Sequence, residues 1–268
     1  MKKTRDYFLL LMLAIFSMAA VETYAEDATT SYLRGLGRDK EGDYRGAVEE
    51  FTKAIVANPS YYQAYLGRGL SRKKLGENEG AIEDYTKTIE LSPGYVKAYN
   101  NRGNVKYATT DYAGALEDYT KAIQLDPKDA NLYRNRSYAK RKLGDLQGAI
   151  LDESEAIRIE PQNGKAYTHR ANIKLEAGDY EGSVQDYDKA IEYTRKNAKA
   201  YYNRGNAKFY LLDYNGAIED YTKAIDINKK YFKAYRNRAT ARIINGDIEG
   251  AREDNAQADG LISSNATQ

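Results

Sequence analysis

The chain repeats one pattern every 34 residues, without insertion or deletion, over most of its length. The repeats, numbered 1 to 7, comprise residues 28–61, 62–95, 96–129, 130–163, 164–197, 198–231 and 232–265, and residues 266–268 follow as a C-terminal tail. A fixed period of roughly 20 to 50 residues is the signature of a solenoid, in which each short unit packs only on its neighbours. We therefore predict an array of similar units.

Each repeat has the three-to-four spacing of apolar residues that is typical of two short amphipathic helices. Small residues at positions 8 and 20 would let the two helix axes approach, and tyrosines at position 4 would fill the space between successive pairs. Position 24 is aromatic in most repeats, as Phe51, Tyr85, Tyr119, Tyr187 and Tyr221. Proline follows at position 32 as Pro59, Pro93, Pro127 and Pro161. Repeat 4 has Glu153 at position 24 instead of an aromatic residue. The sequence does not explain this glutamate.

This pattern resembles that of tetratricopeptide repeat (TPR) proteins, whose units combine a large aromatic residue, small contact residues, a second aromatic residue and a closing proline. The resemblance covers residues 28–265 and is specific for the fold but not for a function. It implies an all-α fold, an α-solenoid of antiparallel helix pairs wound into a right-handed superhelix. It also implies a concave groove lined by the first helix of each pair.

Position 7, where TPR proteins usually carry leucine, is arginine in all seven repeats, and position 23 is acidic in all seven. The arginines are Arg34, Arg68, Arg102, Arg136, Arg170, Arg204 and Arg238, and the acids are Glu50, Asp84, Asp118, Asp152, Asp186, Asp220 and Asp254. Because position 7 lies on the helix–helix side of the periodicity, we predict a ladder of structural ion pairs, within a repeat or between neighbours. The alternative is that these arginines hold a ligand.

Three further features of the repeat concern the second helix. Position 16 is Asp or Glu in every repeat, which predicts a cap for that helix. Position 19 is always glycine, which reflects either close backbone packing or the duplication of one parental unit. In repeat 7, Arg252, Asn255 and Asp259 give the second helix a polar outer face, so this helix is expected to cap the array.

The face expected to line the groove, positions 2, 5, 6, 9, 12 and 13, is strongly basic although the net charge of the chain is only +2. Its cations are Lys40, Lys73, Lys74, Lys97, Arg134, Arg141, Lys142, Lys165, Lys199, Lys233 and Arg236. Asp39 and Glu176 are the acids on the same face. Such a face would attract anionic ligands at low ionic strength, unless it is merely a solvated helix surface.

Asparagines run along the same face at positions 6 and 9, where their amides could both donate to and accept from an extended peptide backbone. This row is similar to the asparagine ladder of the TPR domain in O-linked N-acetylglucosamine transferase. The predicted peptide-binding residues are Lys97, Asn100, Asn101, Asn104, Arg134, Asn135, Arg141, Lys165, His169, Asn172, Lys199, Asn203, Asn206, Lys233 and Asn237.

Chaperone-binding TPR domains use a different device, a clamp of five polar residues that holds a C-terminal carboxylate. Two sets match three of its five positions: Asn104, Asn135 and Lys165, and Asn172, Asn203 and Lys233. In both sets the first lysine and the last arginine of the clamp are replaced, by Asn100 or Thr168 and by His169 or Asn237. These departures argue against capture of a C-terminal carboxylate.

The floor of the predicted groove changes character along the array. Repeats 2 and 4 carry Lys73–Lys74 and Arg141–Lys142 at positions 12 and 13, whereas repeats 5 to 7 carry Leu175, Phe209–Tyr210 and Ile243–Ile244. A ligand with an acidic segment and an apolar segment would fit both parts. The alternative is that these apolar residues pack within the array.

The first 25 residues have the features of a bacterial-type secretory signal peptide. A basic segment, an apolar run over residues 7–20 and the cleavage site Thr23-Tyr24-Ala25 follow one another. The apolar run is shorter than the ~20 residues that span a bilayer, so no stable membrane insertion is expected after cleavage. We expect an exported protein, periplasmic or extracellular.

The chain has no cysteine and a single histidine, His169, and it carries neither a phosphate-binding glycine loop nor a nucleophile–base set. We therefore predict no catalytic residue, no metal site and no cofactor. The favoured function is a scaffold that binds an extended, acidic peptide of a partner protein. An anionic envelope glycan or other polyanion is the alternative ligand, and an enzyme is the least favoured reading. Nucleic acid is not expected as a partner of an exported protein, and self-association through the terminal repeats stays open.

Overall fold

The computed structural model describes residues 27–266, with side chains up to residue 263, and contains no strand among them. After a helix over residues 27–41, the helices are α2 (Tyr44–Ala57), α3 (Tyr62–Leu75), α4 (Asn78–Leu91), α5 (Val96–Ala108), α6 (Tyr112–Leu125), α7 (Ala130–Lys142), α8 (Leu146–Ile159), α9 (Gly164–Glu176), α10 (Tyr180–Tyr193), α11 (Ala198–Tyr210), α12 (Tyr214–Ile227), α13 (Phe232–Ile244) and α14 (Ile248–Ala266). The predicted signal peptide lies outside the described residues. In the part of the chain that the structure describes, every helix is too short or too polar to cross a membrane.

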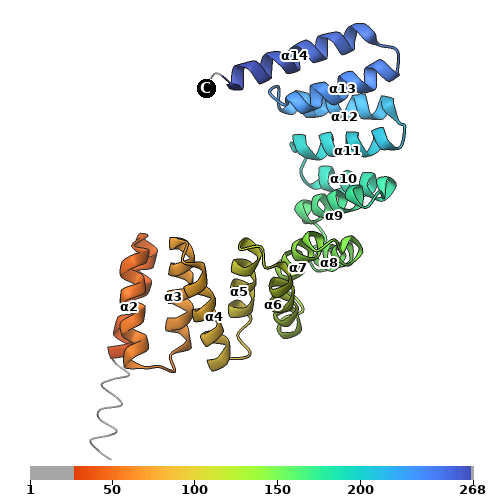
Figure 1. The fold of residues 1–268 in the computed structure, drawn as a ribbon. Coiled ribbons are helices and arrows are strands. Elements are labelled where there is room, and N and C mark those ends of the chain that lie inside the picture. The colour runs from red at the N-terminus through yellow and green to blue at the C-terminus, as the bar shows by residue number, and fades with distance from the viewer. Residues whose placement is uncertain (1–26, 267–268) are drawn as a thin grey trace, which may run out of the picture. The chain divides into compact units, whose positions relative to one another are not determined.

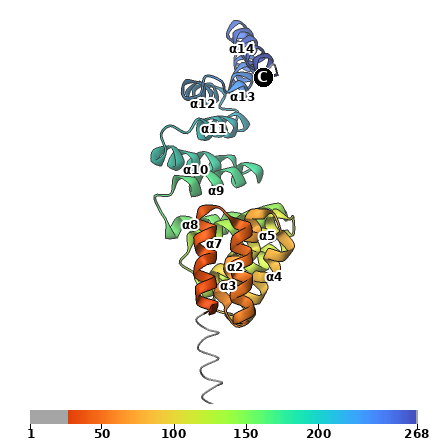
Figure 2. The same cartoon turned by 90° about the vertical axis from the view of Figure 1, so that its left-hand side faces the viewer.

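The chain divides into two compact units, an N-terminal unit that ends at Pro127 and a C-terminal unit that begins at Lys128. Within each unit, every helix packs against the next one in antiparallel fashion (Figure 1). The first helices of successive pairs also touch: α3 contacts α5 in the N-terminal unit, and α11 contacts both α9 and α13 in the C-terminal unit. Figure 2 shows α9, α10 and α11 stacked in this order. Each unit is therefore an all-α solenoid, as predicted, in which the first helices form a row.

The aspartates at position 16 begin the second helices. In six of the seven repeats this aspartate accepts a hydrogen bond from the backbone N–H of the glycine at position 19, at 2.8–2.9 Å. A Cβ atom at Gly114 would lie 2.2 Å from the capping carboxylate of Asp111, which gives the glycine a local reason. The prediction of a cap is wrong in repeat 2, where the side chain of Glu77 makes no cap and lies 3.8 Å from Arg72. Its extra methylene carries the carboxylate past the backbone N–H groups.

The core is built mainly from alanine and tyrosine. The rings at position 24, including Tyr85, Tyr119, Tyr187 and Tyr221, are buried, as are the alanines at position 20. Glycine at position 8 makes room for these rings, because a Cβ at Gly103 would lie only 2.8 Å from the ring of Tyr119. The interlocking of rings with small residues fixes the distance between the two helices of a pair.

Replacing Gly103 by alanine should destabilise the N-terminal unit by about 1–3 kcal/mol, because the extra methyl group overpacks the contact with Tyr119. The matched control is Gly260→Ala in α14, where an added Cβ would meet no atom within 4 Å. That change should be neutral or stabilising by up to about 1 kcal/mol, through helix propensity alone. Urea unfolding of both variants measures the difference, and equal effects would contradict the packing role of Gly103.

The arginines at position 7 form ion pairs within their own repeat, which decides between the two arrangements left open by the sequence. The pairs are Arg68–Asp84, Arg102–Asp118, Arg136–Asp152, Arg170–Asp186, Arg204–Asp220 and Arg238–Asp254, with N–O distances of 2.5–2.7 Å. Each guanidinium also lies over the tyrosine ring at position 4, 5.4–5.9 Å from its centroid. We call this set the arginine–aspartate ladder.

The ladder also joins neighbouring repeats within each unit. Arg102 donates to Thr86 of the preceding repeat, and Arg170 donates to Ser154 in the same way. A second cation at position 11 reaches the same aspartate, as Lys174 does to Asp186 at 2.8 Å. Each buried carboxylate is therefore shared by two cations, which the sequence reasoning did not anticipate.

Repeat 1 corrects the prediction of seven pairs. Arg34 is exposed, and Glu50 is bonded to Lys53 at 2.5 Å instead. No helix pair precedes Arg34 in the described residues, so the side chain of the preceding repeat that contacts the arginine in later repeats, such as Thr86 for Arg102 or Asp188 for Arg204, has no counterpart there. In repeat 7, Arg252, Asn255 and Asp259 on α14 are exposed, in agreement with the polar outer face predicted for this helix.

Candidate functional site

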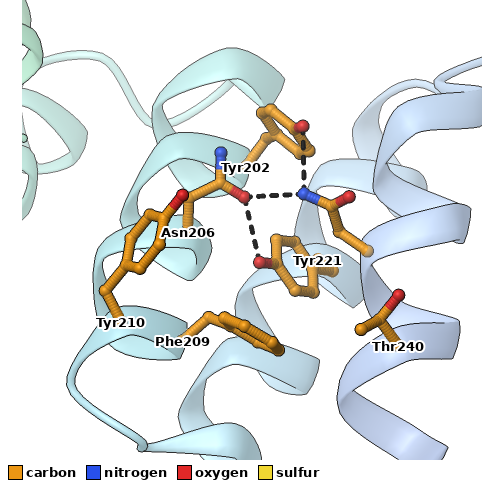
Figure 3. Close-up of a pocket in the computed structure, with 7 residues that line it drawn as sticks. Tyr202, Asn206, Phe209, Tyr210, Tyr221 and Thr240 are labelled. Carbon is orange, nitrogen blue, oxygen red and sulfur yellow. Dashed lines mark hydrogen bonds between the residues drawn. The ribbon is translucent and has the colours of Figure 1, made fainter. Parts of the chain in front are cut away.

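The row of first helices in the C-terminal unit bears two adjoining cavities. One, of about 620 Å³, is lined by Arg141, Asn172, Leu175, Glu176, Tyr180, Lys199, Asn203, Asn206 and Tyr210. The other, of about 320 Å³, is lined by Tyr202, Asn206, Phe209, Tyr210, Tyr221, Asn237 and Thr240 (Figure 3). We call them the polar cavity and the aromatic cavity. They share Asn206 and Tyr210, so a ligand could occupy both.

The asparagines of these cavities are oriented by a repeated network of hydrogen bonds. The hydroxyl of Tyr221 donates to Oδ1 of Asn206 at 2.9 Å, and Nδ2 of Asn237 donates to the same oxygen at 2.8 Å. One repeat earlier, Asn172 accepts in the same way from Tyr187 at 2.7 Å and from Asn203 at 2.8 Å. The carbonyl oxygen at position 9 is thus saturated, and its NH₂ group is left to face a ligand.

The asparagines at position 6 present the opposite group. Because Asn237 and Asn203 donate through Nδ2, their carbonyl oxygens remain available as acceptors. The row therefore alternates a donor from position 9 with an acceptor from position 6. Main-chain amides of an extended peptide carry the matching acceptor and donor.

The polar cavity is positively charged. Arg141 is bonded to Glu176 at 2.6 Å across it, whereas Lys199 lines it and makes no ion pair with any described residue. The pKa of His169 is lowered to about 4, first by burial and then by four surrounding cations, Arg134, Arg141, Lys165 and Lys199. Cations from α7, α9 and α11 therefore act together on this region, which favours an anionic ligand.

The remaining predicted groove residues are placed as follows. Lys97 is exposed on α5 of the N-terminal unit, where Asn100, Asn101 and Asn104 are half-buried. Asn104 accepts from Tyr119 at 2.9 Å, in the arrangement seen in the C-terminal unit. The set Asn104, Asn135 and Lys165 draws on both units, so it stays a prediction. Lys233 lies exposed on α13.

Arg134 corrects the prediction of a groove cation. Its side chain is only 16% exposed, with Nη1 donating to Asn131 at 2.9 Å and Nη2 lying 3.6 Å from Glu160. The guanidinium approaches Glu160, the residue that follows α8, and its charge also acts on the buried carboxylate of Glu153. It therefore contributes to the field of the groove but presents little surface to a ligand.

The junction between repeats 4 and 5 departs from the regular network. Tyr138 stands at position 9 in place of asparagine, His169 at position 6, and Glu153 at position 24 in place of tyrosine. The hydroxyl of Tyr138 lies 2.9 Å from Nδ1 of His169. Glu153 is fully buried, and neither of its oxygens has a hydrogen-bond partner among the described residues. Burial raises the pKa of Glu153 to about 7, and the nearby guanidinium of Arg134 opposes this rise.

Sequence reasoning missed several groove residues. Tyr202, Tyr221 and Thr240 line the aromatic cavity, and Tyr180 stacks on Tyr210 at 4.8 Å between ring centroids. Position 5 is tyrosine in repeats 1 and 6, as Tyr32 and Tyr202, but tyrosines throughout the repeats also serve as core residues. Among the described residues, no three Asp, Glu or His side chains are grouped so that they could hold a metal ion.

Comparisons with known protein families identify the repeats. A family model described as TPR repeat matches residues 71–110 and 171–211, and a model described as Tetratricopeptide repeat matches 96–129 and 198–231. The chain therefore contains tetratricopeptide repeats, and its division into seven of them stays a prediction. No curated protein sequence matches the chain significantly.

Solved structures agree on the fold. The C-terminal part of a TPR repeat-containing protein from Cytophaga hutchinsonii has a TM-score of 0.77 at 18% identity, covering 86% of this chain and 95% of that one. YrrB, described as a TPR protein with an unusual peptide-binding site, has a TM-score of 0.62 at 24% identity, covering 70% and 96%. A MamA protein has a TM-score of 0.61 at 25% identity, covering 65% and 95%. At these identities the likeness shows the fold of TPR arrays.

Proposed function

We propose that this TPR chain is an exported interaction scaffold whose C-terminal unit binds an extended, acidic segment of a partner protein. The peptide would lie along the row formed by α7, α9, α11 and α13. The TPR fold is typically a scaffold without catalytic groups, and YrrB, a protein of this fold, is described as having a peptide-binding site. Export rests on the sequence of residues 1–25, and fractionation of the native cells with N-terminal sequencing of the mature chain tests it.

The observation that carries the proposal is the fixed orientation of the asparagines. Tyr187 and Tyr221 hold Asn172 and Asn206 so that donors and acceptors alternate along the groove. Such a row recognises peptide backbone without regard to side chains, because every residue except proline offers the same two groups. Lys199 then selects for negative charge nearby.

Reversing the charge of Lys199 tests this function directly. We expect Lys199→Glu to lose about tenfold or more in affinity for an acidic partner at low salt, and to reduce the salt dependence of binding. The matched control is Lys223→Glu, which reverses an exposed lysine on α12, away from both cavities. Crosslinking pull-down from the native envelope with each variant is the measurement. Equal recovery of partners by the two variants would move the binding surface away from α11.

An acidic glycan is the second candidate, favoured by the exposed ring of Tyr210 stacked on Tyr180 beside Lys199. Aromatic faces and cations together suit charged sugars. The two candidates separate when the captured material is treated with protease. Retention of the captured ligand after digestion would support the glycan, whereas its loss supports the peptide.

A further inference from the structure

The aromatic cavity is built mostly from one helix. Tyr202, Phe209 and Tyr210 all project from α11, Tyr221 comes from α12, and Asn237 and Thr240 close the far side from α13 (Figure 3). Repeat 6 is the only repeat with aromatic residues at positions 5, 12 and 13 together. In repeat 4 the same positions are Arg134, Arg141 and Lys142. The cavity is therefore a local feature of repeat 6, which the general packing of the array does not require.

The walls of this cavity are held in place by their polar ends. The hydroxyl of Tyr202 accepts from Nδ2 of Asn237 at 3.0 Å, and the hydroxyl of Tyr221 donates to Asn206. Phe209 packs edge-on against Tyr210 and Tyr214, at 6.3 and 5.3 Å between ring centroids. With both hydroxyls engaged in the wall, the rings offer apolar surface to the interior. Such a pre-formed site gains affinity without ordering its own side chains.

The contents of the cavity can be deduced from its size and its neighbour. A volume of about 320 Å³ admits a large side chain, and Tyr210 remains 58% exposed at its mouth. The adjoining polar cavity contains Lys199 and shares Asn206. An extended peptide that passes Asn206 would thus place one side chain among the rings and a neighbouring one beside Lys199. Residues two apart lie on the same face of such a strand, about 7 Å apart.

We propose that the aromatic cavity takes an aromatic side chain of the bound segment, while Lys199 pairs with an acidic residue one or two positions away. The inference rests on the proposed function and specifies the class of peptide that the groove selects. Asn206 and Asn237 hold the backbone between these two side chains, through the NH₂ group of the first and the carbonyl of the second. The partner would therefore carry an acidic residue close to a phenylalanine or tyrosine in an extended stretch.

Fluorescence polarisation with the whole chain and three labelled synthetic peptides tests the inference. The first peptide contains Asp-Gly-Phe within a glycine–serine sequence, the second has alanine for the phenylalanine, and the third has asparagine for the aspartate. We expect the first peptide to bind roughly tenfold more tightly than the second, because burial of the ring is lost. The third should lose affinity through Lys199 and show a weaker dependence on salt.

A variant that fills the cavity provides the second arm. Thr240 is exposed at the rim, so Thr240→Trp should occupy the space without disturbing the core. It should bind the first and second peptides with equal affinity. If wild-type protein already binds these two peptides equally, the aromatic pocket is refuted while the acidic-peptide function stands. If no peptide binds, whereas the pull-down recovers material resistant to protease, both proposals are overturned in favour of the glycan.

Discussion

Replacing Asp186 by leucine is expected to lower the free energy of unfolding by about 3–5 kcal/mol, because it leaves buried cations without a partner. Asp186 is only 4% exposed and accepts from Nε and Nη2 of Arg170 at 2.8 and 2.6 Å. Lys174 adds a third contact at 2.8 Å. Both cations are largely covered, so solvent would compensate only part of the lost attraction.

The triple variant Arg170→Met, Lys174→Met and Asp186→Leu should be far less destabilised than Asp186→Leu alone, because apolar groups of similar shape can replace a complete buried ion network. An exposed ion pair, Lys189 with Glu192 at 2.8 Å, provides the control, and Glu192→Ala should produce no measurable change. Urea unfolding followed by circular dichroism compares the three proteins. If the triple variant is destabilised as much as the single one, the ladder is not an ion-pair network.

The helices and the ladder could be predicted because both depend on spacing alone. An arginine and an acid sixteen residues apart recur in every repeat, and a repeated pair of helices brings positions 7 and 23 face to face. The prediction is wrong for Arg34 and Glu50 because the paired arginines also contact a side chain of the preceding repeat, as Arg102 contacts Thr86, and the pattern of one repeat does not contain this contact. The prediction of a helix cap is wrong at Glu77 because glutamate has one methylene more than the aspartate of the other repeats.

The candidate site was harder to predict because its residue types are those of the core. The sequence pattern predicts Lys174 and the other cations at position 11 to lie on the surface. Only the helix packing brings them to the buried aspartates. Tyr202 and Tyr221 read as core tyrosines, yet both line a cavity. The asparagine row was visible in the sequence, but which amide group faces the groove depends on the hydroxyl groups of buried tyrosines behind it.

The junction at Glu153 shows an exchange of side chains between facing positions. Repeats 3, 5 and 6 place tyrosine at position 24 and asparagine at position 9, whereas repeat 4 has Glu153 and Tyr138. The aromatic ring has moved to the other helix, and the acid occupies the buried side that it left. This exchange was readable in the sequence only once positions 9 and 24 were known to be neighbours, as the bond from Tyr221 to Asn206 makes plain.

Two opposite dependences of stability on pH are expected from Glu153 and His169. Folding raises the pKa of Glu153 from 4.5 to about 7, so its contribution to stability is present below pH 4.5 and is lost as the pH rises to 7. Folding lowers the pKa of His169 from 6.5 to about 4, so its contribution is lost as the pH falls from 6.5 to 4. Between pH 4.5 and 6.5, a rise in pH therefore lowers the stability contributed by Glu153 and raises the stability contributed by His169. In this range the proton lies on the histidine of the unfolded chain and on the glutamate of the folded one.

Single substitutions should reveal the two slopes. His169→Asn, which installs the residue of most other repeats at position 6, should lose roughly 3 kcal/mol of stability between pH 4.5 and 7, because folding raises the pKa of Glu153 from 4.5 to about 7. Glu153→Gln should gain a similar amount, roughly 3 kcal/mol, between pH 4 and 6.5, through His169. The groups that face Glu153 are Arg134, Ser137, Asp152, His169 and Arg170.

Urea unfolding of the C-terminal repeats at a series of pH values makes the measurement, with wild type expected to change least between pH 4.5 and 6.5. The control restores the regular network with Glu153→Tyr, Tyr138→Asn and His169→Asn, and it should remove both slopes. If His169→Asn and Glu153→Gln follow the wild-type profile, Glu153 is charged in the folded protein and its carboxylate must be held by Arg134. If stability instead falls with rising pH in His169→Asn and rises with pH in Glu153→Gln, a neutral glutamic acid and a neutral histidine join repeats 4 and 5.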